Sequence, residues 1–199
     1  MRFIFAIVSF VLAFVLIGYG VAQRTIFAGP DHVTASVSLN SKATVTIIDG
    51  KTLNANTGHQ TLEVSGAKKI FAAYGRSADV RAWVGEASYN RIGYSPTKRA
   101  LTSKIVTGKE SKVPDPHGSD LWLDERSSDS TLEFTVNVPK DISIIIASDG
   151  TKAAPSKVAV RWPLDNRTPW SGPLVIGGVL LLLAGLGLYL IVNSASTVY

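Results

Sequence analysis

The sequence predicts a mostly β extracytoplasmic domain, sandwich-like or β-rich α+β, flanked by N- and C-terminal transmembrane helices. Two apolar runs predict the helices, because residues 3–22 and 173–192 contain no charged side chain over twenty positions each. At about 1.5 Å rise per residue, such a helix spans the roughly 30 Å hydrocarbon core of a bilayer. Between the runs, short segments that alternate apolar with polar residues are separated by turn signals, which is typical of a β-rich domain.

These observations divide the 199-residue chain into five segments. They are an N-terminal transmembrane helix or signal peptide (1–24), the extracytoplasmic domain (25–165), a juxtamembrane linker (166–172), a C-terminal transmembrane helix (173–192) and a short cytoplasmic tail (193–199). The domain is long enough to bury a core of its own. The chain contains no cysteine, so we expect neither a disulfide nor a thiolate metal site.

The first apolar run has two interpretations. It is either an uncleaved transmembrane helix or a signal peptide, with the small residues Gly20 and Ala22 before a cleavage point at Gln23. Its length favours the helix. Both interpretations leave Arg2 in the cytoplasm and the domain outside, by the positive-inside rule. We therefore expect a two-pass protein of the cell (plasma) membrane, with the N-terminus and C-terminus cytoplasmic.

Small residues recur at heptad spacing inside both apolar runs. In the first run they are Ala6, Ala13 and Gly20, and in the second Gly178 and Gly185. Seven residues is close to two helical turns, so each helix carries a small-residue stripe at which another helix can approach closely. The alternative is that glycine and alanine are simply common in membrane helices.

Four residues are predicted to lie at the membrane interface. Trp170 and Tyr189 are near the two ends of the second run, where aromatic rings favour the headgroup region. Arg24 and Arg167 flank the two runs on the domain side, where they can meet lipid headgroups.

Period-two alternation predicts the strands of the domain. The clearest is Thr131–Val138, in which Leu132 and Phe134 begin the inward-facing set. An aspartate–glycine pair at Asp49 is predicted to form a turn. The predicted strands are His32–Leu39, Ala43–Ile48, Gln60–Val64, Lys69–Tyr74, Leu101–Gly108, Thr131–Val138, Ile142–Ala147 and Val158–Trp162; the predicted loops are Leu53–His59, Lys109–Asp120 and Glu125–Ser130.

One short helix is predicted near 78–89. Its apolar residues fall at helical spacing, Ser77 is placed to cap it, and Gly85 weakens it by about 1 kcal/mol relative to alanine. A strand over the same residues is the alternative. The apolar set is Val80, Trp83, Val84 and Ala87.

Charge is unevenly distributed along a chain whose formal net charge is +5. Gly66–Lys112 contains ten Lys or Arg and three Asp or Glu, whereas Val113–Gly150 contains two and eight. The segments either neutralise each other across the fold or form solvated faces. Alternatively, the basic segment forms a surface that meets anionic lipid or wall polymer.

The sequence contains no motif of a known catalytic or nucleotide-binding site. We therefore expect no cofactor and no enzymatic activity. An assembled Ser–His–Asp site from distant residues is the alternative. The one oxygen-rich loop, with Asp115, Asp120 and Asp124, is a weak candidate for calcium, because its spacing differs from that of an EF-hand loop.

Four stretches together resemble a group of uncharacterised two-pass membrane proteins from actinobacteria. They are AYGRSADVRAWVGEASYN, SDLWLDERSS, IIIASDGTKAAPSKVAVRWPLDN and TPWSGPL. The resemblance covers nearly the whole chain and implies an extracytoplasmic β-rich domain, but no activity and no catalytic residues. It departs after Val192, where that group continues into a basic cytoplasmic tail and this sequence reads NSASTVY.

These patterns favour a membrane-anchored extracytoplasmic binding or accessory protein of the cell envelope that is not catalytic. Besides the lipid bilayer, its candidate partners are another membrane or envelope protein and an anionic wall or lipid component; nucleic acid is not expected. Two alternatives stay open. One is an envelope hydrolase or transferase with an assembled site, and the other is an accessory subunit that binds a membrane complex through its helices.

Overall fold

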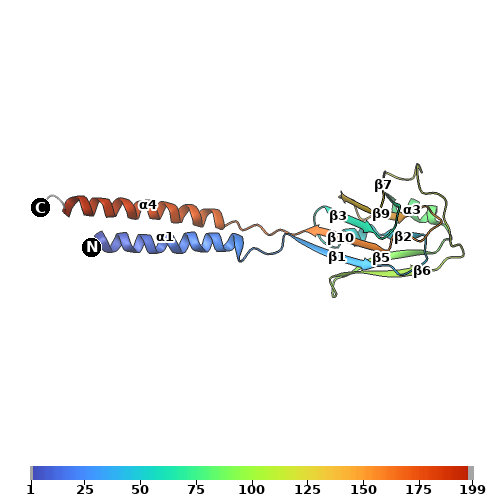
Figure 1. The fold of residues 1–199 in the computed structure, drawn as a ribbon, viewed down its shortest axis with the longest axis horizontal. Coiled ribbons are helices and arrows are strands. Elements are labelled where there is room, and N and C mark those ends of the chain that lie inside the picture. Colours follow the sequence, from blue (N-terminus) through green and yellow to red (C-terminus); the bar gives the residue numbers. More distant parts are fainter. Residues whose placement is uncertain (1, 197–199) are drawn as a thin grey trace. The chain divides into compact units, whose positions relative to one another are not determined.

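A computed structural model describes residues 2–196 and divides them into two units (Figure 1). The helical unit consists of the chain up to Asp31 and from Asp165 onward, and the β domain is His32–Leu164. Of the predicted tail 193–199, the residues up to Ser196 belong to the last helix, and residues 197–199 lie outside the described part of the chain.

Two sheets form the β domain, which confirms the predicted fold class. All pairings are antiparallel except that of β2 with β5, which is parallel. The four-stranded sheet has the order β1 (His32–Ser38), β10 (Lys157–Pro163), β3 (Gln60–Ser65), β8 (Thr131–Val136). The six-stranded sheet has the order β6 (Ala100–Val106), β5 (Tyr89–Ser95), β2 (Val45–Ile48), β9 (Ile142–Ala147), β4 (Ile70–Arg76), β7 (Asp124–Ser128).

The main core lies between the facing sides of the two sheets. Strand β8 shows the alternation that the sequence predicts, with Leu132, Phe134 and Val136 buried and the residues between them exposed. Trp162 on β10 is fully buried, donates its indole N–H to the Leu53 carbonyl and packs edge-to-face on Tyr94 at 5.4 Å between ring centroids. Such burial of apolar surface is the dominant stabilising term of the domain.

Strand β9 is buried on both faces, which explains its continuous isoleucine run. Ile144 and Ile146 face the four-stranded sheet, whereas Ile145 and Ala147 enter a second core on the other side. The second core is covered by α3 (Ser77–Val84) through Val80 and other residues. The six-stranded sheet is therefore the middle layer of the domain.

Helix α3 is shorter than the predicted helix near 78–89. It ends at Val84, and the next residue, Gly85, has a φ of +57°, a backbone conformation that favours glycine. Ser77 is its first residue and does not cap it, because its hydroxyl is bonded to Ser143 at 2.7 Å. Tyr89 already belongs to strand β5.

Three elements differ from the sequence prediction. The predicted turn at Asp49 leads into a one-turn helix, α2 (Gly50–Leu53), and the predicted loop Glu125–Ser130 contains the edge strand β7. Strand β5 was not predicted, because YNRIGYS is polar and contains a glycine. Edge strands such as β7 lack a buried face, so the period-two pattern is absent there.

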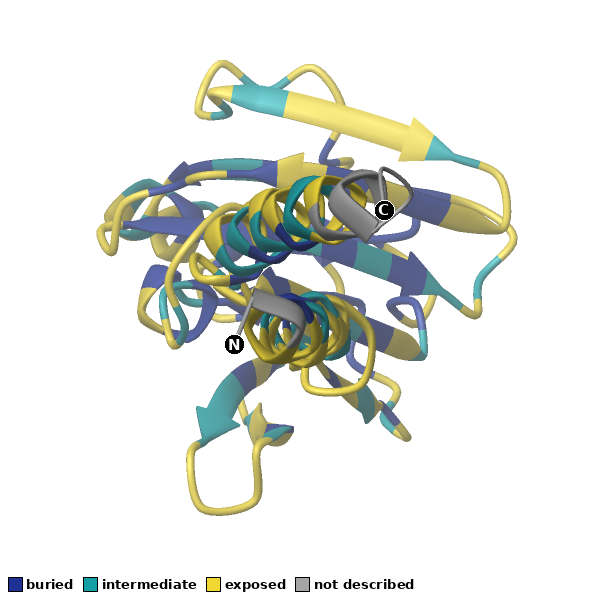
Figure 2. Ribbon diagram, turned by 90° about the vertical axis from the view of Figure 1, so that its left-hand side faces the viewer, coloured by how far each residue is buried: buried dark blue, intermediate teal, exposed yellow. Residues whose placement is uncertain are grey.

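Two long antiparallel helices form the helical unit, and both are long and apolar enough to span a membrane. They are α1 (Arg2–Thr25) and α4 (Ser171–Ser196), and they lie side by side in Figures 1 and 2. Most of their described surface is exposed, as the yellow ribbons in Figure 2 show. An exposed apolar surface of this extent suits lipid rather than water.

The predicted small-residue stripes form the seam between α1 and α4. Ala6 and Ala13 are buried at 1% and 0% exposure. A Cβ on Gly178 would lie 2.9 Å from the Ala13 carbonyl oxygen, and one on Gly185 would lie 3.4 Å from that of Ala6. At the third level, a Cβ on Gly20 would lie 3.0 Å from the carbonyl oxygen of Ser171. The heptad on α4 thus has Ser171 as a third member, which glycine and alanine spacing alone does not reveal.

Candidate functional site

Two neighbouring cavities lie on the β domain. Their volumes are about 510 and 500 Å³, and they share Asp49, Lys51 and Arg91. We call this surface the basic groove. Its lining residues are Asp49, Lys51, Thr52, Ala55, Arg76, Ser77, Ala78, Arg81, Arg91, Ile92, Gly93, Tyr94, Pro96, Thr102, Lys104, Lys140 and Asp141.

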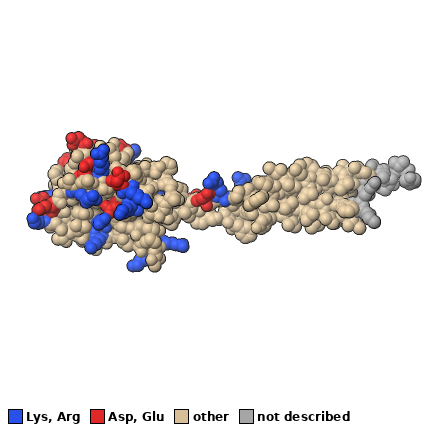
Figure 3. All heavy atoms as spheres, turned by 180° about the vertical axis from the view of Figure 1, so that it is seen from behind, with Lys and Arg blue, Asp and Glu red and all other residues tan. Residues whose placement is uncertain are grey.

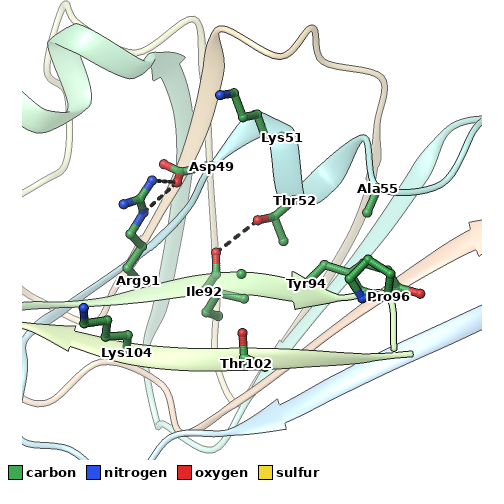
Figure 4. Close-up of a pocket in the computed structure, with 11 residues that line it drawn as sticks. Asp49, Lys51, Thr52, Ala55, Arg91, Ile92, Tyr94, Pro96, Thr102 and Lys104 are labelled. Atoms are coloured by element: carbon green, nitrogen blue, oxygen red, sulfur yellow. Dashed lines mark hydrogen bonds and ion pairs between the residues drawn. The ribbon is translucent and has the colours of Figure 1, made fainter. Parts of the chain in front are cut away.

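Strand pairing and a close backbone approach position the groove. Parallel pairing of β2 with β5 places Ile48 beside Ile92, so Asp49 and Arg91 lie next to each other (Figure 4). Gly50 packs against the carbonyl oxygens of Pro139, Lys140 and Ile142, where any Cβ would clash. This approach, which only glycine permits, brings Lys51 and Lys140 to the same surface.

Hydrogen bonds stiffen the floor of the groove. The buried Thr52 hydroxyl donates to the Ile92 carbonyl oxygen at 3.2 Å, which ties α2 to β5 (Figure 4). Arg91 donates through Nε to Asp49 Oδ2 at 2.7 Å. The charge of Asp49 is thereby neutralised by Arg91.

The remaining charge of the groove is positive. Six basic residues line it against two acidic ones, Asp49 and Asp141. Among the described residues, only the Arg91 member of the basic set forms an ion pair. The other five are exposed and free to attract an anion. The six are Lys51, Arg76, Arg81, Arg91, Lys104 and Lys140.

The basic groove overlaps the predicted basic stretch Gly66–Lys112 but is not confined to it. Four of its six basic residues come from the basic stretch Gly66–Lys112, whereas Lys51 and Lys140 come from outside it. Blue and red side chains lie interspersed on the face of the β domain drawn in Figure 3, whereas the described part of the helix pair carries almost no charge along its length. The acidic stretch contributes Asp141 to the groove but does not neutralise it.

A second polar site brings together a carboxylate, an imidazole and a hydroxyl. His117 Nδ1 lies 2.6 Å from Asp115 Oδ1, and His117 Nε2 lies 3.4 Å from the Ser127 hydroxyl oxygen. The imidazole packs edge-to-face on the buried Phe71, at 4.7 Å between ring centroids. We call these three residues the Asp–His–Ser cluster, and they line a cavity of about 430 Å³ that Lys69 also lines.

Local turn geometry builds this cluster. Asp115 Oδ1 also accepts the backbone N–H of His117 at 3.1 Å, as in a turn closed by an aspartate side chain. The hydrogen bonds from His117 lower the pKa of Asp115 below its ordinary value, so the carboxylate stays ionised. Ser127 reaches the histidine because β7 pairs with β4 in a register that sets Ser127 opposite Phe71.

Two of the three aspartates of the predicted calcium loop have different partners. Asp115 is bonded to His117, and Asp124 accepts a hydrogen bond from Arg126 Nη2 at 2.9 Å. Within residues 2–196, no group of three or more His, Asp or Glu is placed to hold a metal ion. The structure therefore does not bring Asp115, Asp120 and Asp124 together as a metal site.

The predicted interface residues all belong to the helical unit. Trp170 and Tyr189 are 69% and 44% exposed. Arg24 ends α1, and Arg167 precedes α4 and donates through Nε and Nη2 to both carboxylate oxygens of Asp165, at 2.9 and 2.8 Å. Arg24 and Arg167 line one common cavity, which the sequence did not predict.

Comparisons with known proteins add no family. No family model matches the chain, and no curated protein matches it in sequence. Among solved structures, the flagellar cap protein FliD from Escherichia coli, in its D1-D2-D3 domains, is 7% identical with a TM-score of 0.17. That alignment covers 94% of this chain and 71% of the other.

Proposed function

We propose that this protein is a membrane-anchored extracytoplasmic binding protein of the cell envelope, whose basic groove holds an anionic wall or lipid component. The observation that carries the proposal is the set of five basic side chains in the groove that have no acidic partner among the described residues. Basic side chains line both cavities, which suits an extended anion with several charged groups better than a single small ion.

The anchoring part of the proposal rests on the two apolar helices. Their length supports two membrane spans, and Arg2 ahead of the first span supports cytoplasmic termini with the β domain outside. We also propose, from the resemblance of the sequence, that the chain is related to the actinobacterial two-pass membrane proteins. The small-residue stripes are buried where α1 packs against α4. A protein that binds the helices would therefore have to contact their other faces.

Binding of long-chain polyphosphate to the full chain in a neutral detergent tests the groove. We expect saturable binding, and a variant carrying Lys51→Gln, Arg81→Gln and Lys104→Gln to lose about tenfold or more in affinity. Fluorescence anisotropy of labelled polyphosphate measures it, and rising salt should weaken the wild type more steeply than the variant.

A charge-matched variant separates the groove from net charge. Lys42→Gln, Lys68→Gln and Lys157→Gln remove the same charge from exposed positions outside the groove. We expect this variant to bind within about threefold of the wild type. Equal losses in both variants would show that binding follows overall charge, and the groove would then have no special role.

A second candidate function is ester hydrolysis at the Asp–His–Ser cluster. The Asp115 carboxylate contacts His117 Nδ1, and His117 Nε2 contacts the Ser127 hydroxyl. This is the arrangement that activates a nucleophilic serine. Ser127 would attack the ester carbonyl carbon as its proton passes to His117, and the alcohol would leave with that proton. Water would then release the acid. Lys69, on the same cavity, supplies positive charge for the oxyanion.

Labelling with a fluorophosphonate probe tests this second candidate. The full chain should become labelled, Ser127→Ala and His117→Gln should abolish labelling, and Ser128→Ala on the next residue of β7 should keep it. Labelling of wild type no stronger than that of Ser127→Ala would exclude a nucleophilic Ser127. Groove binding would be unaffected by either result.

A further inference from the structure

A cavity in the helical unit lies at the ends of α1 and α4 that adjoin the β domain in sequence. Its volume is about 460 Å³, and Arg24, Arg167, Thr168 and Ser171 are among the residues that line it. Arg24 comes from the last turn of α1, whereas the other three belong to the linker and the start of α4. Arg24 and Arg167, which are far apart in the sequence, thus line the same cavity.

The charge of this cavity is positive. Arg24 makes no ion pair among the described residues, and Asp165, the partner of Arg167, does not line the cavity. The bonds to Asp165 use Nε and Nη2 of Arg167, which fix the guanidinium plane. The pair also raises the pKa of Arg167, so the group stays charged. The first turn of α4 contains no acidic residue that would repel an anion.

The walls of the cavity are held in place by local hydrogen bonds. Ser171 N–H donates to the Thr168 carbonyl oxygen at 3.1 Å, and the Ser171 hydroxyl donates to the same oxygen at 2.9 Å. Asn166 donates to the Gly29 carbonyl oxygen at 3.4 Å, which ties the two chain segments together. A site with fixed walls binds a ligand without first paying to order them.

The position of the cavity along the helices selects the ligand. Apolar residues begin within one turn after Ser171, and the exposed Trp170 lies beside the cavity in the sequence. If the helices span a bilayer, this is the depth of the headgroups. We propose that Arg24 and Arg167 clamp the phosphate group of an anionic phospholipid. This inference rests on the anchoring part of the proposed function and not on the basic groove.

Native mass spectrometry of the full chain in a neutral detergent tests the site with three probes: phosphatidylglycerol, inorganic phosphate and diacylglycerol. We expect one phosphatidylglycerol to be retained per chain, and Arg24→Gln and Arg167→Gln each to lower its retention about tenfold. Arg161→Gln, the same change on the β domain, should retain the lipid. Competition by inorganic phosphate would show that the phosphate group is recognised.

Each outcome decides the proposal. Binding of inorganic phosphate without retention of phosphatidylglycerol would support the arginine clamp but assign free phosphate as its ligand. Equal retention of phosphatidylglycerol by the wild type and both arginine variants, or equal retention of diacylglycerol, would overturn the proposal. Failure of polyphosphate binding in the groove would leave these measurements unchanged. A cross-link between Ser9→Cys and Gly185→Cys, across the seam of α1 and α4, serves as the folding control for both variants.

Discussion

At the scale of single residues, Trp162 connects the two sheets and α2. It is fully buried, and its indole N–H is bonded to the Leu53 carbonyl oxygen. Trp162→Phe would leave that oxygen without its donor and a small void beside Tyr94. We expect a loss of about 2–4 kcal/mol in the free energy of unfolding. Urea denaturation of the full chain in detergent, followed by near-ultraviolet circular dichroism, measures it.

A matched substitution provides the control for this prediction. Trp170 is 69% exposed and makes no ring contact among the described residues. We expect Trp170→Phe to change the free energy of unfolding by less than about 0.5 kcal/mol. Similar losses at the two positions would contradict the assigned role of Trp162.

The carboxylate of Asp165 is predicted to titrate unusually low. Hydrogen bonds from the side chain and backbone of Arg167 lower its pKa from 3.8 to about 2. A lowered pKa stabilises the folded turn above about pH 4, and this contribution disappears as the pH falls through about 2. Carbon-13 NMR titration should show that Arg167→Gln moves the pKa of Asp165 back toward its ordinary value. An unchanged pKa in that variant would show that the pair does not form.

Residue patterns in the sequence predicted some of these roles. The stripe of Ala6, Ala13 and the glycines followed from spacing alone, because a helix converts heptad spacing into one face. The basic groove did not, because its charges come from segments that meet only in the folded domain, through the β2–β5 pairing and the approach of Gly50 to Lys140. The Asp–His–Ser cluster was left open for the same reason, since Ser127 lies on a strand that the sequence did not predict.

At the scale of elements, the glycines of α4 differ in what they allow. A Cβ on Gly178 would lie 2.6 Å from Ile17 Cγ1, whereas one on the adjacent Gly177 would meet nothing within 4 Å. We expect Gly178→Leu to destabilise the packing of α1 on α4 by about 1–3 kcal/mol, and Gly177→Leu to leave it unchanged.

An introduced cysteine pair reports on this seam, since the natural chain has no cysteine. A Cβ on Gly185 would lie 3.1 Å from the Cβ of Ser9, a few tenths of an ångström shorter than the roughly 3.5–4.5 Å between the Cβ atoms of a disulfide. Ser9→Cys with Gly185→Cys should therefore cross-link in membranes under oxidation. Added Gly178→Leu should reduce the yield and added Gly177→Leu should not. An equal yield with both would refute the seam.

Sequence patterns predicted elements well where one face is buried and poorly elsewhere. Strand β8 alternates cleanly because one side meets the core and the other meets solvent. Strands β5 and β7 were missed, since polar side chains and an edge position hide the period. The end of α3 was misplaced because Gly85 stops the helix before its apolar spacing ends.

At the scale of the whole molecule, topology is the property to test first. Lys109 is exposed on the β domain, with its ammonium 3.0 Å from Glu86 Oε1. We expect Lys109→Cys to react with a membrane-impermeant maleimide in intact cells, because the domain is proposed to be outside. Labelling is read by gel fluorescence.

A second cysteine gives the opposite expectation. Ser194→Cys lies in the segment predicted to be cytoplasmic, so it should react only after lysis. Reaction of Lys109→Cys only after lysis would invert the topology, and the wall polymer or outer-leaflet lipid would then be excluded as the ligand of the groove.

The register of β1 with β10 bears on whether the β domain can be replaced by another domain. His32 lies opposite Pro163, so the chain enters and leaves the β domain at neighbouring strand ends. A domain whose ends adjoin can be inserted into a host loop without stretching it. We therefore expect that another domain with adjoining ends could replace His32–Leu164 between α1 and α4.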